Sequence, residues 1–273
     1  MTWSCSFRSS FRLFPDLARS PDNLDILLAN TGATPDEVLA QLHYDEARAA
    51  VPGAMPNPKR YRDLRQLYRT VGLLYEDPNT SRLVITELGK AVARWRPVLN
   101  SRNALVLGRH AAQALAACQL RNPTRDGRNY GPDTVVFPFA FIWRAMLALD
   151  YRISSDELNR AMLKTRNEND LADAIEAIRE ARATGDVTLL GDETVTEAAK
   201  NDRILVWMSW ASFGWTLITD KRTSASGDYE IPERNRRVLR DAASITYRHR
   251  DFAREADYVR YVSASAGLPE DIR

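Results

Sequence analysis

The sequence is poor in the residues that build metal centres and disulfide frameworks. It has only two cysteines and three histidines among 273 residues, and none of them cluster at the spacing of zinc ligands. One bridge between Cys5 and Cys118 is possible, but two reduced thiols in a cytoplasmic protein are the simpler interpretation of cysteines so far apart in the sequence. We therefore predict a cytoplasmic protein that holds no metal and no cofactor.

Long apolar runs are also missing. The longest, Val135–Leu149, is too short and too interrupted to cross a bilayer, so we expect no contact with a membrane. Met1–Phe7 shows no basic segment followed by an apolar core, so we expect no secretion signal. With 12 glycines, 13 prolines and 44% hydrophobic residues, the composition is typical of a globular protein with a sizeable core.

The motifs of common catalytic sites are absent as well. The sequence contains no Gly-x-x-x-x-Gly-Lys-Ser/Thr loop for a nucleotide phosphate, no Gly-x-Gly-x-x-Gly after a strand and no Gly-x-Ser-x-Gly elbow. His110 and Cys118 fall on one predicted helix, two turns apart, where direct contact between their side chains is not expected. The sequence therefore favours a protein without catalytic activity.

The positive charge of the chain is concentrated in short arginine clusters. The whole sequence has 38 basic and 36 acidic residues, a net charge of +2, which by itself says little about nucleic acid. The clusters are Lys59–Arg69, Arg234–Arg240 and Tyr247–Arg254. Arginine suits phosphate and guanine because its planar fork donates two hydrogen bonds at once. Each cluster is either part of a nucleic-acid contact or a solvated helix face paired with nearby acids.

The first third of the chain has the pattern of helices followed by a β-hairpin. Thr34 and Glu37 form a capping box at the start of a helix, and Gly72 closes the helix Pro58–Val71. The apolar positions of that helix recur at helical spacing and should face inward: Tyr61, Leu64, Tyr68 and Val71. Its polar positions should lie on the opposite, open face: Lys59, Arg62, Gln66 and Arg69. Two strands and a helix capped by Thr86 should follow, at Leu73–Tyr75, Leu83–Thr86 and Glu87–Trp95.

A long helix and a loop rich in Gly and Pro connect this segment to a second one. The helix is expected at Ser101–Leu120 and the loop at Asn122–Pro132. The second segment should contain helices at Phe139–Asp150, Ser154–Lys164, Leu171–Arg182 and Thr194–Phe213, strands at Trp215–Ile218 and Asp228–Ile231, and a closing helix from Pro232 to Ser244. The tail Ile245–Arg273 has a helical pattern at first. It could contact DNA, contact a partner or pack on the second segment.

Both segments follow the order helix, glycine, strand, polar turn, strand and capped helix, which suggests a diverged duplication. That order is the helix–turn–helix plus hairpin plan of a winged helix. We therefore predict a mainly α fold with short β-hairpins, arranged as two tandem winged-helix units. The expected boundaries are residues 1–98 for the first unit, 99–134 for the connecting helix and loop, and 135–273 for the second unit with its helical tail.

Four stretches, taken in order, carry a resemblance to a known family. They are Tyr68–Leu74, Leu83–Lys90, the Gln-x-x-Asn-Pro element Gln119–Pro123, and Val136–Trp143 with Ile153–Leu158. From about Pro21 to Ala243, the chain resembles the DNA-recognition portion of Type IIS restriction endonucleases that have tandem winged-helix domains.

Those enzymes also carry a separate metal-dependent nuclease module with a Glu-x-Lys element or a relative of it. This chain has no such element. Glu87 and Lys90 are the nearest approach to it, but two residues separate them where the element has one. The resemblance therefore implies recognition of DNA without cleavage. It also implies a place in a bacterial restriction or phage-defence system, with a nuclease or another subunit of that system as a partner.

The charge pattern and the expected fold predict which residues contact double-stranded DNA. The helix Pro58–Val71 should enter the major groove, with the hairpin beside it on the phosphate backbone. The expected contacts of the first unit are Lys59, Arg60, Arg62, Arg65, Gln66, Arg69 and Arg82. Those of the second unit are Lys200, Asn201, Arg203, Lys221 and Arg222. Trp207, Trp210 and Trp215 are either core residues or a cage for a flipped or methylated base.

Two other functions are consistent with the same sequence. Winged helices also dock other proteins, and a chain with a net charge of +2 suits a protein–protein adaptor. A nuclease with an atypical active site is the third possibility, and it would nick plasmid DNA in the presence of magnesium or manganese. The main prediction is a DNA-binding protein that reads sequence or base modification.

Overall fold

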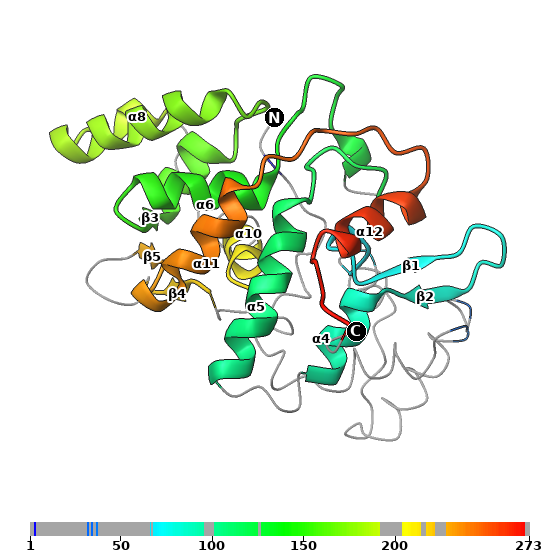
Figure 1. Ribbon diagram of the computed structural model, residues 1–273. Helices are drawn as coiled ribbons and strands as arrows, with labels where there is room; N and C mark the ends of the chain where they lie inside the picture. The colour runs from blue at the N-terminus through cyan, green and yellow to red at the C-terminus, as the bar shows by residue number, and fades with distance from the viewer. Residues whose placement is uncertain are drawn as a thin grey trace, which may run out of the picture.

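In the residues that it describes, the computed structural model is mainly helical, with two small antiparallel sheets (Figure 1). It describes Trp3, Gly32, Thr34, Glu37 and Gln66, and residues 68–95, 101–124, 127–191, 204–213, 217–221 and 228–270. The predicted dominance of helices with short hairpins is thus confirmed for these residues. Within the same ranges, no helix has the length and apolarity needed to span a membrane.

The predicted hairpin of the first unit and its flanking helices are present. They comprise a helical segment through Gln66 and residues 68–70, strands β1 (Leu74–Glu76) and β2 (Leu83–Ile85), which pair antiparallel, and helix α4 (Glu87–Trp95). Gly72 closes the first helix with a φ of +82°, which glycine adopts without strain. Thr86 joins the hairpin to α4, because its hydroxyl accepts from Gly89 N at 3.0 Å and donates to the Gly72 carbonyl at 2.7 Å. The capping box of Thr34 and Glu37 is also confirmed, with bonds of 2.7 and 3.3 Å.

Helix α5 (Ser101–Ala116) connects the two units and ends earlier than the predicted Leu120. Its last expected turn is lost because the N–H groups there bond to other segments. Gln119 N donates to the Tyr258 hydroxyl at 3.4 Å, and Leu120 N donates to the Val136 carbonyl at 2.9 Å. The loop that follows contains the 3-10 turn η3 (Gly127–Asn129).

The second unit contains more elements than the sequence predicted. They are α6 (Pro138–Ala148), β3 (Arg152–Ser154), α7 (Ser155–Glu157), the π-helical turn η4 (Leu158–Met162), α8 (Asp170–Thr184), the 3-10 turn η5 (Val187–Leu190), α10 (Leu205–Ala211), β4 (Thr219–Asp220), β5 (Asp228–Glu230) and α11 (Glu233–Ser244). The predicted capping box of Ser154 and Glu157 is confirmed. The predicted strand Trp215–Ile218 is wrong in position, since Leu217 and Ile218 are fully buried core residues and β4 begins after them.

The sheet of the second unit has three strands in the order β3-β5-β4. Strand β3 was not predicted, because only Ile153 of its three residues is apolar and buried. It pairs antiparallel with β5, with Ile153 opposite Tyr229, and both side chains are fully buried. The sheet therefore ties the turn after α6 to the hairpin that precedes α11.

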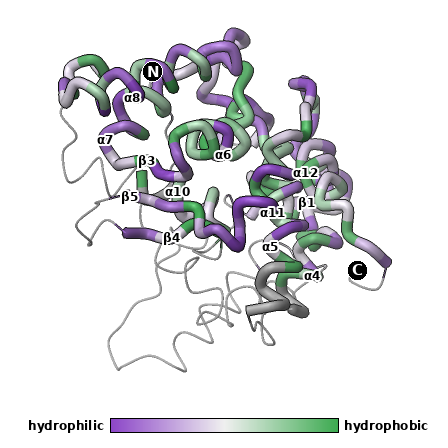
Figure 2. The backbone as a smooth tube through the Cα atoms, turned by 60° about the vertical axis from the view of Figure 1, so that its left-hand side comes forward, coloured by the Kyte–Doolittle hydropathy of each residue, from purple (hydrophilic) through white to green (hydrophobic). Residues whose placement is uncertain are grey.

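Helix α6 lies at the centre of the second unit and is largely buried. Figure 2 colours much of it green, for hydrophobic, whereas purple predominates along α11. Its Phe141, Ile142 and Trp143 are fully buried, and the Trp143 indole donates to the Ala211 carbonyl at 2.9 Å. Helix α11 packs against both α5 and α6 (Figure 1), so its remaining face is left towards solvent.

The start of the described chain packs on the second unit, and the last helix packs on the first unit. Trp3 is buried in the second unit, where its main-chain N–H and its indole N–H donate to the carbonyls of Leu163 and Thr165 at 2.6 and 2.7 Å. In the other direction, α12 (Glu255–Ala264) packs on β1, α4 and α5. The alternative that the tail packs on the second unit is therefore wrong for α12. The predicted domain boundaries stay a prediction.

Candidate nucleic-acid interface

Two predicted DNA contacts on the helix that ends at Gly72 are covered by the rest of the protein. Gln66 is buried, with 8% of its surface exposed. The Arg69 side chain is 12% exposed and lies between two carboxylates, with Nη2 2.7 Å from Glu76 and Nη1 3.1 Å from Glu255. The prediction of an open face is wrong at these two positions, and at Arg69 the reason is that α12 and β1 bring carboxylates over it. The other predicted contacts of this helix lie outside the described residues: Lys59, Arg60, Arg62 and Arg65.

The remaining predicted contacts lie on the hairpins or outside the described ranges. Arg82 is exposed at the start of β2, and its guanidinium donates to the Gly32 carbonyl. Lys221 follows β4 and forms an ion pair with Glu230 of β5. Either side chain would have to share or release its partner to bind a phosphate. The others lie outside the described residues: Lys200, Asn201, Arg203 and Arg222.

The structure has a further concentration of positive charge along α11 and the segment after it. Residues 233–250 contain six arginines and two acidic residues, a formal net charge of +4, whereas the whole chain carries +2. Five of these arginines are exposed and define the basic strip: Arg234, Arg237, Arg240, Arg248 and Arg250. Within the described residues, the only carboxylate paired with a strip arginine is Asp241, 3.9 Å from Arg237, whose side chain is 91% exposed. The strip is therefore mostly uncompensated positive charge.

The segment between α11 and α12 presents its arginines on an extended backbone rather than on a helix. Thr246, Arg248 and Arg250 are exposed, while Tyr247 and His249 between them are partly buried, which is the period of two of an extended chain. The rings of both partly buried residues pack on Phe137. The predicted helical start of the tail is therefore wrong, and α12 begins only at Glu255.

A single glutamine fixes the position of this extended segment. The Gln119 side chain is 1% exposed; its Oε1 accepts from Arg250 N at 2.6 Å and its Nε2 donates to the Arg250 carbonyl at 3.1 Å. These two bonds replace the ones that a helix would have supplied to the same main-chain groups. The sequence singled out Gln119–Pro123 and the cluster Tyr247–Arg254 separately, and the fold brings them together.

The two segments meet around a pocket of about 380 Å³, which we call the arginine pocket. It is lined by Arg121, Asn122, Pro123, Gly127, Arg128, Tyr130, Arg250, Asp251 and Phe252. In Figure 1 the orange connection from α11 to α12 runs near the green loop that follows α5. Three guanidinium groups and one carboxylate thus surround a space of small-molecule size.

Asn122 shapes the floor of the arginine pocket. Its Nδ2 donates to the Gln119 carbonyl at 2.7 Å, and its Oδ1 accepts from the main-chain N–H and the hydroxyl of Thr124 at 2.9 and 2.6 Å. Gly127 packs directly on this amide, since a Cβ at Gly127 would lie 2.3 Å from the Asn122 Cγ. Glycine is therefore required at position 127, where the main chain lies against the Asn122 side chain.

Arg121 carries the main charge interactions of the arginine pocket. Its Nη1 is 2.7 Å from Asp251 Oδ1, and its Nη2 is 3.4 Å from Nδ1 of His249. Burial, followed by the positive charge of Arg121, holds the pKa of His249 below its usual value, so the imidazole is neutral at pH 7. Arg121 Nε and His249 Nε2 are buried and have no hydrogen-bond partner among the described residues. Each such group costs about 1–3 kcal/mol when it is left unsatisfied.

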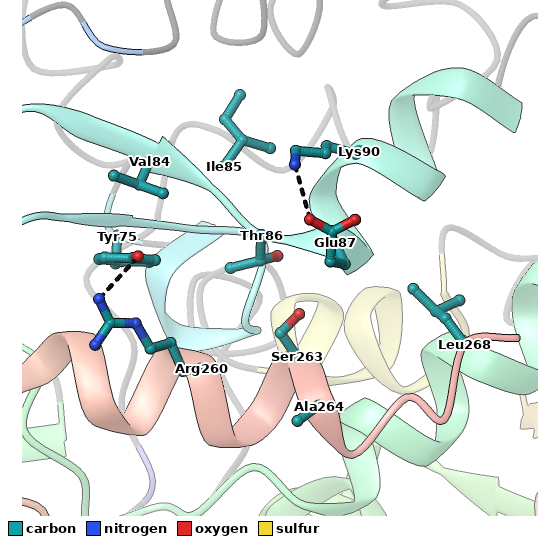
Figure 3. A pocket seen from close by; sticks show the side chains of 10 residues that line it. All are labelled: Tyr75, Val84, Ile85, Thr86, Glu87, Lys90, Arg260, Ser263, Ala264 and Leu268. Atoms are coloured by element: carbon teal, nitrogen blue, oxygen red, sulfur yellow. Dashed lines mark hydrogen bonds and ion pairs between the residues drawn. The ribbon is translucent and has the colours of Figure 1, made fainter. Parts of the chain in front are cut away.

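A second hollow, of about 390 Å³, lies between the first hairpin, α4 and α12 (Figure 3). Its polar groups are already bonded within the protein. Arg260 donates to the Tyr75 hydroxyl at 2.9 Å, and Lys90 pairs with Glu87 at 2.7 Å (Figure 3). The first turn of α4 is also capped, because Leu88 N donates to the Ser263 hydroxyl at 3.3 Å. This hollow is the seam along which α12 packs on the first unit.

The tryptophans and the cysteine that the sequence offered as candidate site residues are buried where the structure describes them: Trp207, Trp210 and Cys118. Trp207 and Trp210 are 8% and 2% exposed, so the alternative of a cage for a flipped base is wrong for both, and Trp215 lies outside the described residues. Burial raises the pKa of the Cys118 thiol to about 12. The His110 ring bonds to the Ala266 carbonyl at 2.9 Å, whereas the Cys118 thiol bonds to the Thr70 and Ala114 carbonyls at 3.6 Å, so the two side chains have different partners.

Comparison of the chain with protein-family models and with curated proteins gives no match. The resemblance to the Type IIS recognition region therefore stays a prediction from the residues. Among the residues that the structure describes, no three His, Cys, Asp or Glu side chains gather as they would around a metal ion. The basic strip and the arginine pocket are thus the candidate functional surfaces of the described residues.

Proposed function

We propose that this chain is a double-stranded-DNA-binding protein and that the basic strip is its main contact with the phosphate backbone. The observation that carries the proposal is the net charge of +4 on residues 233–250, within a chain whose total is +2. Phosphate contacts by arginine release condensed counterions from DNA, which supplies most of the affinity that does not depend on sequence. An exposed arginine that has no carboxylate partner can bind a phosphate without first breaking an ion pair.

The arrangement of α11 supports a contact of this kind. Arg234, Arg237 and Arg240 are spaced by three residues, so they lie on neighbouring turns over about 9 Å of helix. The opposite side of the helix is held by α5 and α6. The strip then continues along the extended segment through Arg248 and Arg250, so the charge follows a line rather than a patch.

We infer in addition that each unit is a winged helix that reads sequence or base modification. In its support, hairpin β1–β2 directly follows a helix, and hairpin β4–β5 follows α10. Arg82 and Lys221, on the two hairpins, are the described residues of the predicted recognition set that stay exposed enough to reach a phosphate. The predicted base contacts on residues 58–65 and 200–203 complete this proposal. The place in a bacterial restriction or phage-defence system, with a partner that supplies cleavage, follows from the resemblance.

The test is binding of the purified chain to randomised duplex DNA, with selection and sequencing, at two salt concentrations. Enrichment of a defined site, with weaker binding at the higher salt concentration, supports a sequence reader. The absence of binding to both plain and methylated duplexes would overturn the proposal and favour the protein–protein adaptor. An adaptor's apolar interface would also show little dependence on salt.

Variants of the basic strip make the test specific. Arg237→Ala and Arg240→Ala should each reduce the slope of log K against log salt by about 1, if each arginine contacts one phosphate. The matched control is Arg179→Ala on α8, which removes an arginine that is 54% exposed but lies outside the strip. Equal salt slopes for all three variants would remove the strip from the proposal.

A further inference from the structure

The arginine pocket has a composition that suits a small anion better than a duplex. Its described lining residues carry three guanidinium groups, on Arg121, Arg128 and Arg250, and one carboxylate, on Asp251. The carboxylate is already bound to Arg121 at 2.7 Å. We propose that this pocket binds a nucleoside 5′-phosphate, with the phosphate among the three guanidinium groups and the base against Phe252. The inference goes beyond the proposed function, because a nucleotide pocket requires no contact with duplex DNA.

Hydrogen bonds within the protein hold the walls of the pocket in place without a ligand. Arg250 is fixed at its main chain by the buried Gln119. Arg128 is fixed through its Nε, which donates to the Pro123 carbonyl at 2.6 Å. Among the described residues, none forms a hydrogen bond or ion pair with the Nη atoms of Arg128. The Nε bond of Arg128 leaves its Nη groups for a ligand, and the Arg250 guanidinium lies over the Tyr261 ring, 5.0 Å from the centroid, a contact that does not use its N–H groups.

The charge of the pocket matches a phosphomonoester. Three arginines and one aspartate among the described lining residues give a formal charge of +2. A phosphomonoester carries about −1.5 to −2 at pH 7, whereas each phosphodiester of a nucleic-acid backbone carries a single negative charge. The pocket is therefore better matched to a terminal phosphate than to an internal one.

An aromatic wall completes the match to a nucleotide. Phe252 lines the pocket, and its ring is held by Tyr258 and Tyr261, with centroid distances of 5.5 and 5.2 Å. Tyr130 and Pro123 add apolar surface. Bases stack on aromatic side chains without regard to sequence, and about 380 Å³ lies in the size range of small-molecule sites. The same chemistry could come from a free nucleotide or from the phosphorylated end of a DNA strand.

The test is calorimetric titration of the full chain with adenosine 5′-monophosphate, with adenosine and inorganic phosphate as the comparison probes. We expect one molecule of the monophosphate to bind, at least tenfold more tightly than either adenosine or phosphate alone. The source is distinguished by competition: a 5′-phosphorylated oligonucleotide that displaces the monophosphate, when its 5′-hydroxyl counterpart does not, identifies a strand end. Failure of both oligonucleotides to displace it identifies a free nucleotide. The absence of monophosphate binding would overturn the inference.

Two variants assign the binding to this pocket. Arg128→Ala and Arg250→Ala remove exposed side chains, so the fold should be retained, and each should weaken monophosphate binding at least tenfold. Unchanged binding in both variants would overturn the inference. The matched control is Arg237→Ala in the basic strip, which should weaken duplex binding and leave monophosphate binding unchanged. This control separates a failure of the proposed function from a failure of the nucleotide pocket.

Discussion

Replacing Gly72 by alanine tests the packing of the C-terminal helix on the first unit. Gly72 has a φ of +82°, and a Cβ added there would lie 2.7 Å from Val262 Cγ1 and 2.9 Å from Ser263 N. The Ser263 atom is main chain of α12, so the contact cannot be relieved by rotating a side chain. The substitution therefore adds two costs: the positive φ of a non-glycine residue, and overpacking against a helix.

The two costs have different sizes and can be separated. A left-handed conformation costs a non-glycine residue about 1–2 kcal/mol, and overpacking costs about 1–3 kcal/mol. Gly72→Ala should therefore lower the free energy of unfolding by about 2–5 kcal/mol. Gly185→Ala is the matched control, because Gly185 has a φ of +75° but nothing within 4 Å of the added Cβ. It should lose only the conformational part, about 1–2 kcal/mol.

Equilibrium unfolding in guanidinium chloride, followed by circular dichroism, measures both values. A larger loss in Gly72→Ala than in Gly185→Ala supports the packing of α12 on the end of the first helix. Equal losses in the two variants would refute it, since the clash with Val262 and Ser263 would then be absent. A midpoint shift with an unchanged denaturant slope is the required control for a single unfolding transition.

Three further predictions concern side chains that are buried or partly buried. Trp3→Ala should lower the free energy of unfolding by about 3–5 kcal/mol in a denaturant titration, because a fully packed indole is lost; a loss under 1 kcal/mol would contradict its burial. Cys118, measured in a Cys5→Ser background, should react with a thiol reagent at pH 8 only after unfolding, since burial raises its pKa to about 12. Burial, followed by the charge of Glu157, raises the pKa of Asp228, so the folded state holds this proton more tightly and stability falls as the pH rises from the unfolded pKa through the raised one. Asp228→Asn should therefore stabilise the protein at pH 7 and have no effect near pH 3, below the usual aspartate pKa of about 3.9, in unfolding curves at both pH values; equal effects at both would contradict the shift.

The elements with strong local signals could be predicted from the sequence. The capping boxes at Thr34 and Ser154 and the glycine at position 72 are determined by hydrogen bonds within a few residues of each other, so the sequence pattern contains the whole interaction. Strand β3 could not be predicted, because its pairing partner lies in β5, more than seventy positions away. Short strands of this kind depend on tertiary contacts rather than on propensity.

The sequence could predict only part of the candidate site. The arginines of α11 and of the extended segment were visible as clusters, yet they were not chosen as contacts, because the helix before Gly72 had more basic residues in a row. Local net charge over residues 233–250 was the signal that could have identified them. The burial of Arg69 depends on Glu255, and the arginine pocket depends on Gln119 bonding to Arg250. No pattern within one segment contains either contact.

The crossing of the chain ends sets the order in which the protein can fold during synthesis. Helix α12 covers one face of β1 and α4. The first unit is therefore synthesised first, but it can finish folding only after α12 has been synthesised. At roughly 5–20 residues per second, the interval between the synthesis of Gly72 and that of Ala264 is about 10–40 s. During that time the surfaces of β1 and α4 on which α12 packs in the finished protein stay uncovered. The nascent chain therefore exposes apolar surface long enough to need protection from aggregation, and an isolated first unit would expose it permanently.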